Sequence, residues 1–156
     1  MIERAGRHYL ISQLIAGDIE VATPERDRGI DLIAYLDREG DTPGFLACPI
    51  QLKANEKARF GVDQKYAHIP NLLMVYVWNV SEPSETAVYA LTYKEAVELL
   101  SQRGHTDTKS WNELGGYSLS INDTWRGLLA PYRMKPELWK PKMLSVCRKN
   151  QFDANN

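Results

Sequence analysis

The fold is decided by Gly29-Ile30-Asp31-Leu32-Ile33-Ala34-Tyr35 and Pro49-Ile50-Gln51-Leu52-Lys53, two apolar stretches with polar side chains among them. Side chains alternate along a strand, so Gln51 and Lys53 point the same way. Residues 37–44 between the stretches are dense in turn formers, which predicts a hairpin joining two antiparallel strands. A carboxylate, an amide and an ammonium group would then converge at one end of a sheet.

The hairpin has a register that the structure can test. Residues 45–53 predict a strand whose even positions form one apolar face, and residues 30–36 predict a central strand covered on both sides. Pairing Leu36 with Leu46 would set Asp31 opposite Gln51. A charge at position 31 then needs a partner.

These residues resemble the PD-(D/E)xK nuclease superfamily, and within it the small archaeal Holliday-junction resolvases and restriction-endonuclease-like proteins. The family pattern is a helix bearing a Glu, a strand carrying Asp after a Gly-rich approach, a hairpin, and (Asp/Glu)-x-Lys on the next strand. Glu3, Asp31 and Gln51-Leu52-Lys53 match this pattern in order, over about the first half of the chain. The resemblance implies an α/β fold of the restriction-endonuclease-like kind, with a mixed central sheet flanked by helices in a single domain.

The resemblance also implies a catalytic site with a divalent cation, Mg²⁺ or Mn²⁺, because such ions take oxygen ligands and stabilise the charge that develops in phosphodiester cleavage. Asp31 is the expected main ligand, with Gln51, the carbonyl of Leu52 and Glu3 as further ligands. Lys53 would orient a water or neutralise the developing charge. Gln51 departs from the pattern, since an amide replaces a carboxylate, which predicts weaker metal binding and leaves activity open.

The helical period places Glu3 on the inner side of the first predicted helix. Stepping back along the apolar stripe of that helix reaches Arg7 and then Glu3. Two interpretations stay open: a carboxylate at the rim of a metal site, or an ordinary Glu3/Arg7 ion pair at i, i+4. The stripe itself consists of Leu10, Ile11, Leu14 and Ile15.

Composition favours one globular domain, because 44% of the 156 residues are hydrophobic and 25% are charged. No apolar run has the length of a membrane span, and the first residues are unlike a signal peptide, so we expect a cytoplasmic protein without a membrane partner. The net charge of −1 argues against a protein that coats nucleic acid nonspecifically. Cys48 and Cys147 lack paired metal-ligand spacing, and core packing is expected for Cys48.

Basic residues gather in two places that would suit nucleic acid. Near the predicted site they are Arg26, Arg28, Lys57, Arg59 and Lys65. Residues 131–156 follow the predicted domain of residues 1–130, with prolines that predict an extended basic arm along a phosphate backbone, including Lys140 and Lys142. The alternative is a tail that packs Trp139 on the domain or on a partner subunit.

The remaining elements complete a mixed α/β unit. Thr92, with Glu95 three residues later, predicts a capped helix that ends at Gly104, and Trp125 is expected to close the core. Strands are predicted at residues 18–23, 72–78, 86–91 and 117–121, short helices at 60–68 and 123–129, and a loop at 105–116.

Three functions are compatible with the sequence. The first is a divalent-metal-dependent nuclease acting on DNA. The second is a catalytically inactive nuclease-like module that only binds nucleic acid, because Gln51 has replaced the carboxylate. The third is a protein-interaction module, such as a homodimer joined through the aromatic segment around Trp139. The sequence favours the first.

Overall fold

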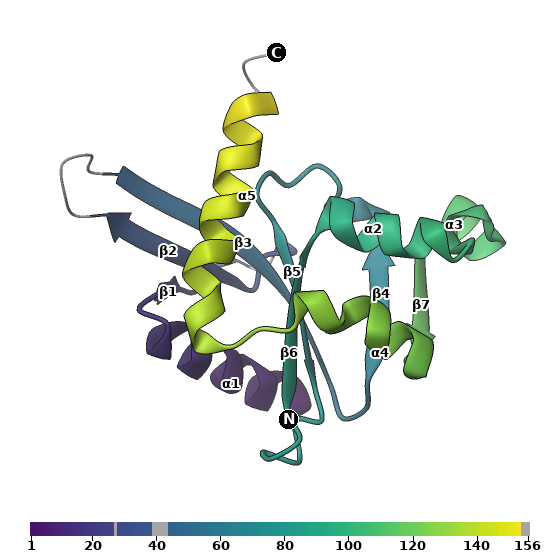
Figure 1. The fold of residues 1–156 in the computed structure, drawn as a ribbon, viewed down its shortest axis with the longest axis horizontal. Helices are drawn as coiled ribbons and strands as arrows, with labels where there is room; N and C mark the ends of the chain where they lie inside the picture. The colour runs from purple at the N-terminus through teal and green to yellow at the C-terminus, as the bar shows by residue number, and fades with distance from the viewer. Residues whose placement is uncertain (27, 39–43, 154–156) are drawn as a thin grey trace.

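In the computed structural model of the protein, five strands form a mixed central sheet in the order β1-β2-β3-β5-β6 (Figure 1). The parallel neighbours are β3 and β5, and every other neighbouring pair is antiparallel. The structure describes the backbone of residues 1–26, 28–38 and 44–153, and their side chains except 38 and 148–153. The strands are β1 (Glu20–Ala22), β2 (Leu32–Arg38), β3 (Gly44–Asn55), β5 (Leu73–Trp78) and β6 (Ala87–Thr92).

The predicted register of β2 against β3 is confirmed. Leu36 pairs with Leu46, and the ladder continues to Leu32 and Ile50. The backbone amide of Asp31 donates to the carbonyl of Ile50 at 2.8 Å, so Asp31 lies one position before β2 and across from Gln51. The predicted connection, residues 37–44, falls partly outside the described residues.

The prediction that β2 is covered on both sides holds only in part. The strand is internal to the sheet, between β1 and β3. Leu32, Ala34 and Leu36 are buried, whereas Ile33 and Tyr35 on the other face are only half-buried. One face of β2 is therefore the core face, and the face that leads to Asp31 is partly open.

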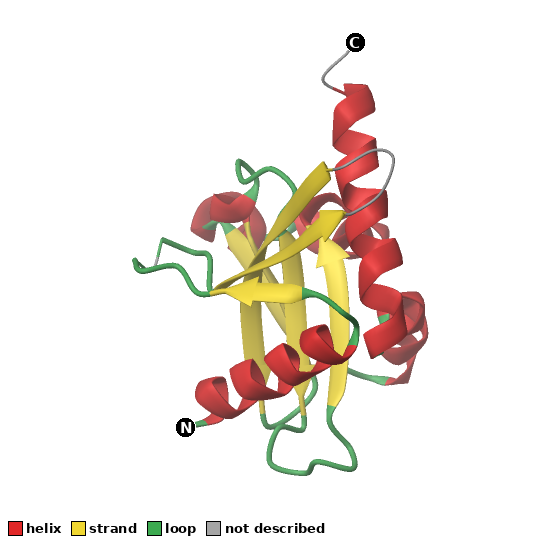
Figure 2. Ribbon diagram, turned by 90° about the vertical axis from the view of Figure 1, so that its left-hand side faces the viewer, coloured by secondary structure: helices red, strands yellow, loops and turns green. Residues whose placement is uncertain are grey.

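Two long helices cover the core face. Residues on α1 (Ile2–Ala16) and α5 (Trp139–Asp153) share one apolar cluster with buried residues of β2, β3 and β5, and we call this the first core. In Figure 2, α1 runs from the side of the sheet that carries the loop before β2 to the side that carries α5. The first core includes Leu10, Leu14, Ile50, Val75, Trp139 and Met143.

A second core lies on the opposite face of the sheet. It is closed by α2 (Tyr93–Gln102), by α4 (Asp123–Leu129), and by a two-stranded antiparallel ribbon of β4 (Arg59–Asp63) and β7 (Gly116–Ser120). The capping box of Thr92 and Glu95 at the start of α2 is confirmed, and Trp125 is buried as predicted. The predicted mixed α/β domain, with a mixed central sheet flanked by helices, is thus what the structure shows.

The interpretation of residues 131–156 as an extended arm is wrong. The segment contains short 3₁₀ turns at Ala130–Tyr132 and Pro136–Leu138 and then α5, whose Trp139 and Met143 are fully buried. The prolines do not prevent this, because Pro136 begins a 3₁₀ turn and Pro141 lies in the first turn of α5, where helical amides need no partner. The alternative of Trp139 packing on its own domain is confirmed, so this residue is not available to join two subunits.

Two other predicted elements differ from the structure. The helix predicted at residues 60–68 is instead the strand β4 followed by a 3₁₀ turn at Gln64–Tyr66. The loop predicted at residues 105–116 contains a 3₁₀ turn (His105–Asp107) and α3 (Lys109–Leu114), which Thr108 caps. Within the described part of the chain, no helix has the length and apolar character that a bilayer crossing requires.

Candidate functional site

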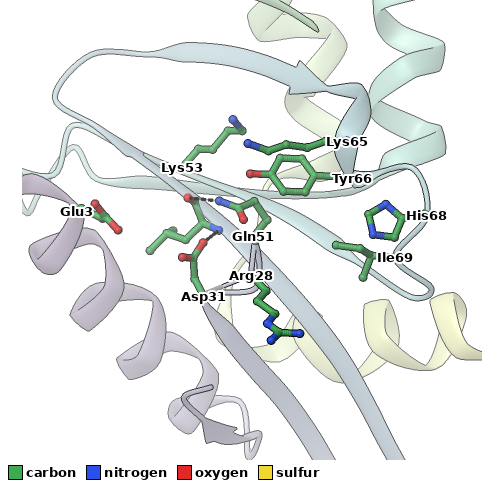
Figure 3. Close-up of a pocket in the computed structure, with 11 residues that line it drawn as sticks. Glu3, Arg28, Asp31, Gln51, Lys53, Lys65, Tyr66, His68 and Ile69 are labelled. Atoms are coloured by element: carbon green, nitrogen blue, oxygen red, sulfur yellow. Dashed lines mark hydrogen bonds between the residues drawn. The ribbon is translucent and has the colours of Figure 1, made fainter. Parts of the chain in front are cut away.

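A pocket of about 580 Å³ opens where β2 begins and β3 ends (Figure 3). The structure brings all five residues of the predicted metal-dependent centre to this pocket. Gln51 and Lys53 lie on the same side of β3, as the alternation predicts. The five residues are Glu3, Asp31, Gln51, Leu52 and Lys53.

Asp31 is held by both the sheet and α1. Its Oδ2 accepts a hydrogen bond from the Leu52 amide at 2.7 Å, and the Arg7 guanidinium lies 3.9 Å from its Oδ1. Arg7 also donates to the backbone carbonyl of Asp31 at 3.2 Å. The partner that a carboxylate at this depth requires is therefore Arg7, together with the β3 backbone.

The turn that delivers Asp31 depends on a glycine. Gly29 adopts a φ of +85°, and a Cβ there would lie 3.0 Å from the Tyr66 ring. Both the left-handed conformation and the close approach favour glycine. The glycine that precedes Asp31 thus has a physical reason in this chain: it lets the loop turn sharply against Tyr66, which lines the pocket.

Glu3 reaches the rim of the pocket from the first turn of α1. Gly6 allows the helix to approach β3 this closely, because the Cβ of any other residue at this position would clash with the side chain of Ala54. Arg7 turns to Asp31, so the alternative interpretation of a Glu3/Arg7 pair is not what the structure shows. Of the predicted apolar stripe, Leu10 and Leu14 are buried, whereas Ile15 is 62% exposed.

Gln51 presents an unsatisfied acceptor. Its Nε2 donates to the carbonyl of Leu52 at 3.3 Å, while its Oε1 is buried without a hydrogen-bond partner. A buried acceptor without a donor costs free energy, and such an atom needs either a proton donor or a cation. Gln51 Oε1, the Leu52 carbonyl and the carboxylates of Asp31 and Glu3 form an oxygen-only set, which suits Mg²⁺ or Mn²⁺ better than softer metals.

Charge around the pocket limits how strongly it can hold a metal. Among the described residues, no group of three or more His, Cys, Asp or Glu side chains is placed to bind a metal ion. The oxygen atoms at the pocket are of the type that a divalent cation prefers, but only two of these groups, Asp31 and Glu3, are carboxylates, and Asp31 already pairs with Arg7. We therefore expect weak metal binding, as the Gln51 substitution predicts.

Lys53 stands beside these oxygens in a partly dehydrated position. Burial is the main reason why the pKa of Lys53 is lowered from its usual value, and nearby Lys65 lowers it further, while Asp63 and Asp31 act in the opposite direction. Its Nζ lies 5.9 Å from the centre of the Tyr66 ring. A lysine in this setting holds its proton less tightly than a lysine in water.

No family model, curated protein or solved structure matches the chain.

The predicted nucleic-acid-binding residues lie in four different places. Arg28 and Lys65 line the pocket, and Arg59 lines a neighbouring hollow. Arg26 and Lys57 are exposed and do not line either space.

The structure does not bring Lys140 and Lys142 to the site. Lys140 pairs with Asp18 at 3.4 Å, beyond the C-terminal end of α1, whereas Glu3 is at the start of this 15-residue helix, about 22 Å away along its axis. Lys142 pairs with Glu95 at 2.8 Å, and both side chains are largely buried. Both lysines lie on a packed helix and not on a free arm, and this fixes them away from the pocket.

Several residues of the site carried little or no signal in the sequence. Arg7 follows Glu3 by one helical turn, and this spacing predicts an ion pair between these two residues and not the contact of Arg7 with Asp31. Tyr66 and His68 belong to a segment whose predicted helix is wrong, and His68 stood alone in the sequence. Ser118 reaches the neighbouring hollow through the pairing of β4 with β7, which local sequence patterns do not specify.

Proposed function

We propose that the protein is a divalent-metal-dependent nuclease that hydrolyses phosphodiester bonds, with DNA as its substrate. The observation that carries the proposal is the convergence of Asp31, Gln51 and Lys53 on one pocket through the β2–β3 register. Glu3 joins them from α1, in the element order of the PD-(D/E)xK pattern. The unsatisfied Oε1 of Gln51 supports a cation at the same place.

Each residue of the pocket would have a separate role in phosphodiester hydrolysis. Asp31, Glu3, Gln51 Oε1 and the Leu52 carbonyl are the groups that would hold the metal, with Arg7 and the Leu52 amide fixing the Asp31 carboxylate. A bound divalent cation would supply positive charge to the phosphate oxygens and lower the pKa of a coordinated water. Lys53 would neutralise the charge that develops on the phosphate, and Arg28 and Lys65 would orient the substrate.

A cleavage assay on a panel of DNA forms tests the proposal. Purified protein is incubated with linear duplex, single-stranded and branched DNA in magnesium, in manganese, and in a chelator. We expect cleavage that requires metal and is lost in Asp31→Asn. Asp18→Asn is the matched control, because Asp18 is an exposed carboxylate at a left-handed position that asparagine tolerates well.

Two outcomes would overturn the nuclease proposal. One is intact DNA across the panel without a metal-induced rise in melting temperature. The other is cleavage that Asp31→Asn leaves unchanged, since a contaminant would then carry the activity. The melting temperature of Asp31→Asn must remain close to that of the wild type, because this carboxylate also accepts the Leu52 amide.

The second candidate function is an inactive nucleic-acid-binding module. It is favoured by the neutral Gln51 and by Arg7, which already balances the charge of Asp31. Salt-sensitive DNA binding without cleavage in any metal would support this function over the first.

Gln51→Glu is expected to strengthen metal binding about tenfold, equivalent to about 1.4 kcal/mol. The change turns the unsatisfied amide oxygen into a third carboxylate next to Asp31 and Glu3. Without metal, repulsion among these carboxylates should lower the melting temperature; with saturating magnesium, the shift should reverse. Thermal melting across a magnesium titration measures both effects.

The control for this prediction is Gln102→Glu, which adds the same charge at an exposed position near the end of α2. Equal magnesium dependence in Gln51→Glu and Gln102→Glu would show that the pocket does not hold the ion.

A further inference from the structure

A second hollow, of about 390 Å³, adjoins the pocket on the other side of Lys53. The two spaces share Glu3, Leu52 and Lys53 as lining residues, so they meet at the end of β3. We call these two adjoining spaces the groove, because Glu3, Leu52 and Lys53 of the candidate centre line both of them. The second hollow extends toward the β4–β7 ribbon, and its walls include Arg59 and Ser118.

The ribbon presents hydrogen-bond donors to this second hollow. The Nη2 of Arg59 donates to Ser118 Oγ at 3.2 Å, which orients the guanidinium. A guanidinium has five N–H donors, so one bond to a serine leaves others for a ligand. Within the described ranges, no carboxylate lies at ion-pair distance from Arg59, and its side chain is exposed.

The two strands of the ribbon pack closely at the hollow. A Cβ at Gly61 would lie 2.9 Å from the Cβ of Ser118, which Gly61 faces across the β4–β7 pair. Two buried side chains hold β4 in place from below. Tyr76 donates to the carbonyl of Gly61 at 2.7 Å, and Trp78 donates to the carbonyl of Arg59 at 2.8 Å. The β4 backbone that carries Arg59 is therefore anchored to the buried strand β5.

The opposite arm of the groove is also cationic. Arg28 and Lys65 line the first pocket beyond Lys53, and Lys65 is 64% exposed although it lies 3.4 Å from Asp63. Figure 3 shows Lys65 and Lys53 on the same side of the pocket, with Arg28 lower in the view. Cationic donors thus flank Lys53 along the groove in both directions, which is the charge pattern of a phosphate backbone that continues past the central residue.

We propose that the groove holds a nucleic-acid strand on both sides of Lys53, with Arg59 and Ser118 contacting its phosphate backbone on one side and with Lys65 and Arg28, at separate points, contacting it on the other. The inference rests on the proposed function for the identity of the central residue, and it adds the path of the strand. It also assigns the β4–β7 ribbon a role as a phosphate-binding wall. A strand that continues in both directions fits cleavage within a nucleic-acid strand, because this binding mode does not require a strand end.

Binding without metal tests the path separately from cleavage. The probe is a fluorescent single-stranded oligodeoxythymidylate, titrated in chelator over a range of potassium chloride concentrations. Each lost phosphate contact should reduce the slope of log affinity against log salt by about 0.7. We expect Arg59→Gln to weaken binding several-fold and reduce this slope, Ser118→Ala to have a smaller effect, and Arg59→Lys to retain the slope.

Lys140→Gln is the matched control, because it removes an exposed charge on α5, away from the groove. If Arg59→Gln matched Lys140→Gln in both affinity and slope, the proposed path would be overturned even if the wild type cleaves DNA. If Arg59→Gln reduced the slope while the wild type left every DNA intact, the groove would stand and the nuclease proposal would fail. Unchanged melting temperatures of the Arg59 variants are expected, since only the backbone of Arg59 anchors Trp78.

Discussion

Trp139→Ala is expected to lower the free energy of unfolding by about 3–5 kcal/mol, the largest stability effect that we predict for a single substitution. The indole is fully buried in the first core, where it joins α5 to the residues of α1 and the sheet. Removing it leaves a cavity that the surrounding side chains fill only partly. Urea denaturation of wild type and variant, compared at equal m-values, measures the effect.

The neighbouring Leu138 provides the control for this prediction. Its side chain is 41% exposed, so Leu138→Ala should cost much less. Trp139→Phe should also cost less than the alanine variant, because Nε1 of Trp139 is buried without a hydrogen-bond partner and phenylalanine removes that donor. Equal losses for Trp139→Ala and Leu138→Ala would mean that α5 is peripheral to the fold.

Lys53→Ala is expected to reduce metal-dependent cleavage by about 100- to 1,000-fold, as the loss of one preorganised cationic or donor group usually does. The side chain stands between the two arms of the groove, beside Asp31 and Gln51. The effect should fall mainly on the chemical step, with DNA binding weakened by only about one phosphate contact. Single-turnover cleavage, measured beside the salt dependence of binding, separates the two contributions.

The lowered pKa of Lys53 gives this prediction a pH signature. As the pH rises through that lowered pKa, the side chain loses its charge earlier than an ordinary lysine, so cleavage should fall at a pH where Lys53→Arg stays charged. Stability should change in the opposite direction. The unfolded chain holds this proton more tightly than the folded protein, so the contribution of Lys53 to stability rises with pH between the folded and unfolded pKa values. Parallel pH profiles for the wild type and Lys53→Arg would contradict the assignment.

The part of the fold that the sequence predicts well is local. The β2–β3 register follows from two apolar patterns and a short connection, and the pairing of Leu36 with Leu46 then sets Asp31 across from Gln51. The capping box at Thr92 is equally local, because its two residues are three positions apart. Patterns of this kind are readable because the interacting residues are close in the chain.

The elements that were predicted incorrectly depend on distant partners. The strand β4 pairs with the distant strand β7, and Val62 lies opposite Tyr117. Nothing within residues 60–68 specifies that partner. The prolines of residues 131–141 argue against a helix interior, but Pro141 lies in the first turn of α5, where proline is tolerated, so their presence does not exclude this helix. For the candidate site, the carboxylate, amide and lysine could be predicted, whereas Arg7 as partner of Asp31 and Ser118 beside Arg59 required the tertiary structure.

The two cysteines have a practical consequence. Cys48 on β3 and Cys147 on α5 are both buried, with their sulfur atoms 3.9 Å apart across the contact between helix and sheet. Burial, with the neighbouring sulfur, raises the pKa of the Cys48 thiol, so this group is a poor nucleophile while the contact is intact. An alkylating reagent can reach it only when α5 leaves the sheet, so the rate of thiol labelling reports the opening of this helix–sheet contact without an introduced cysteine.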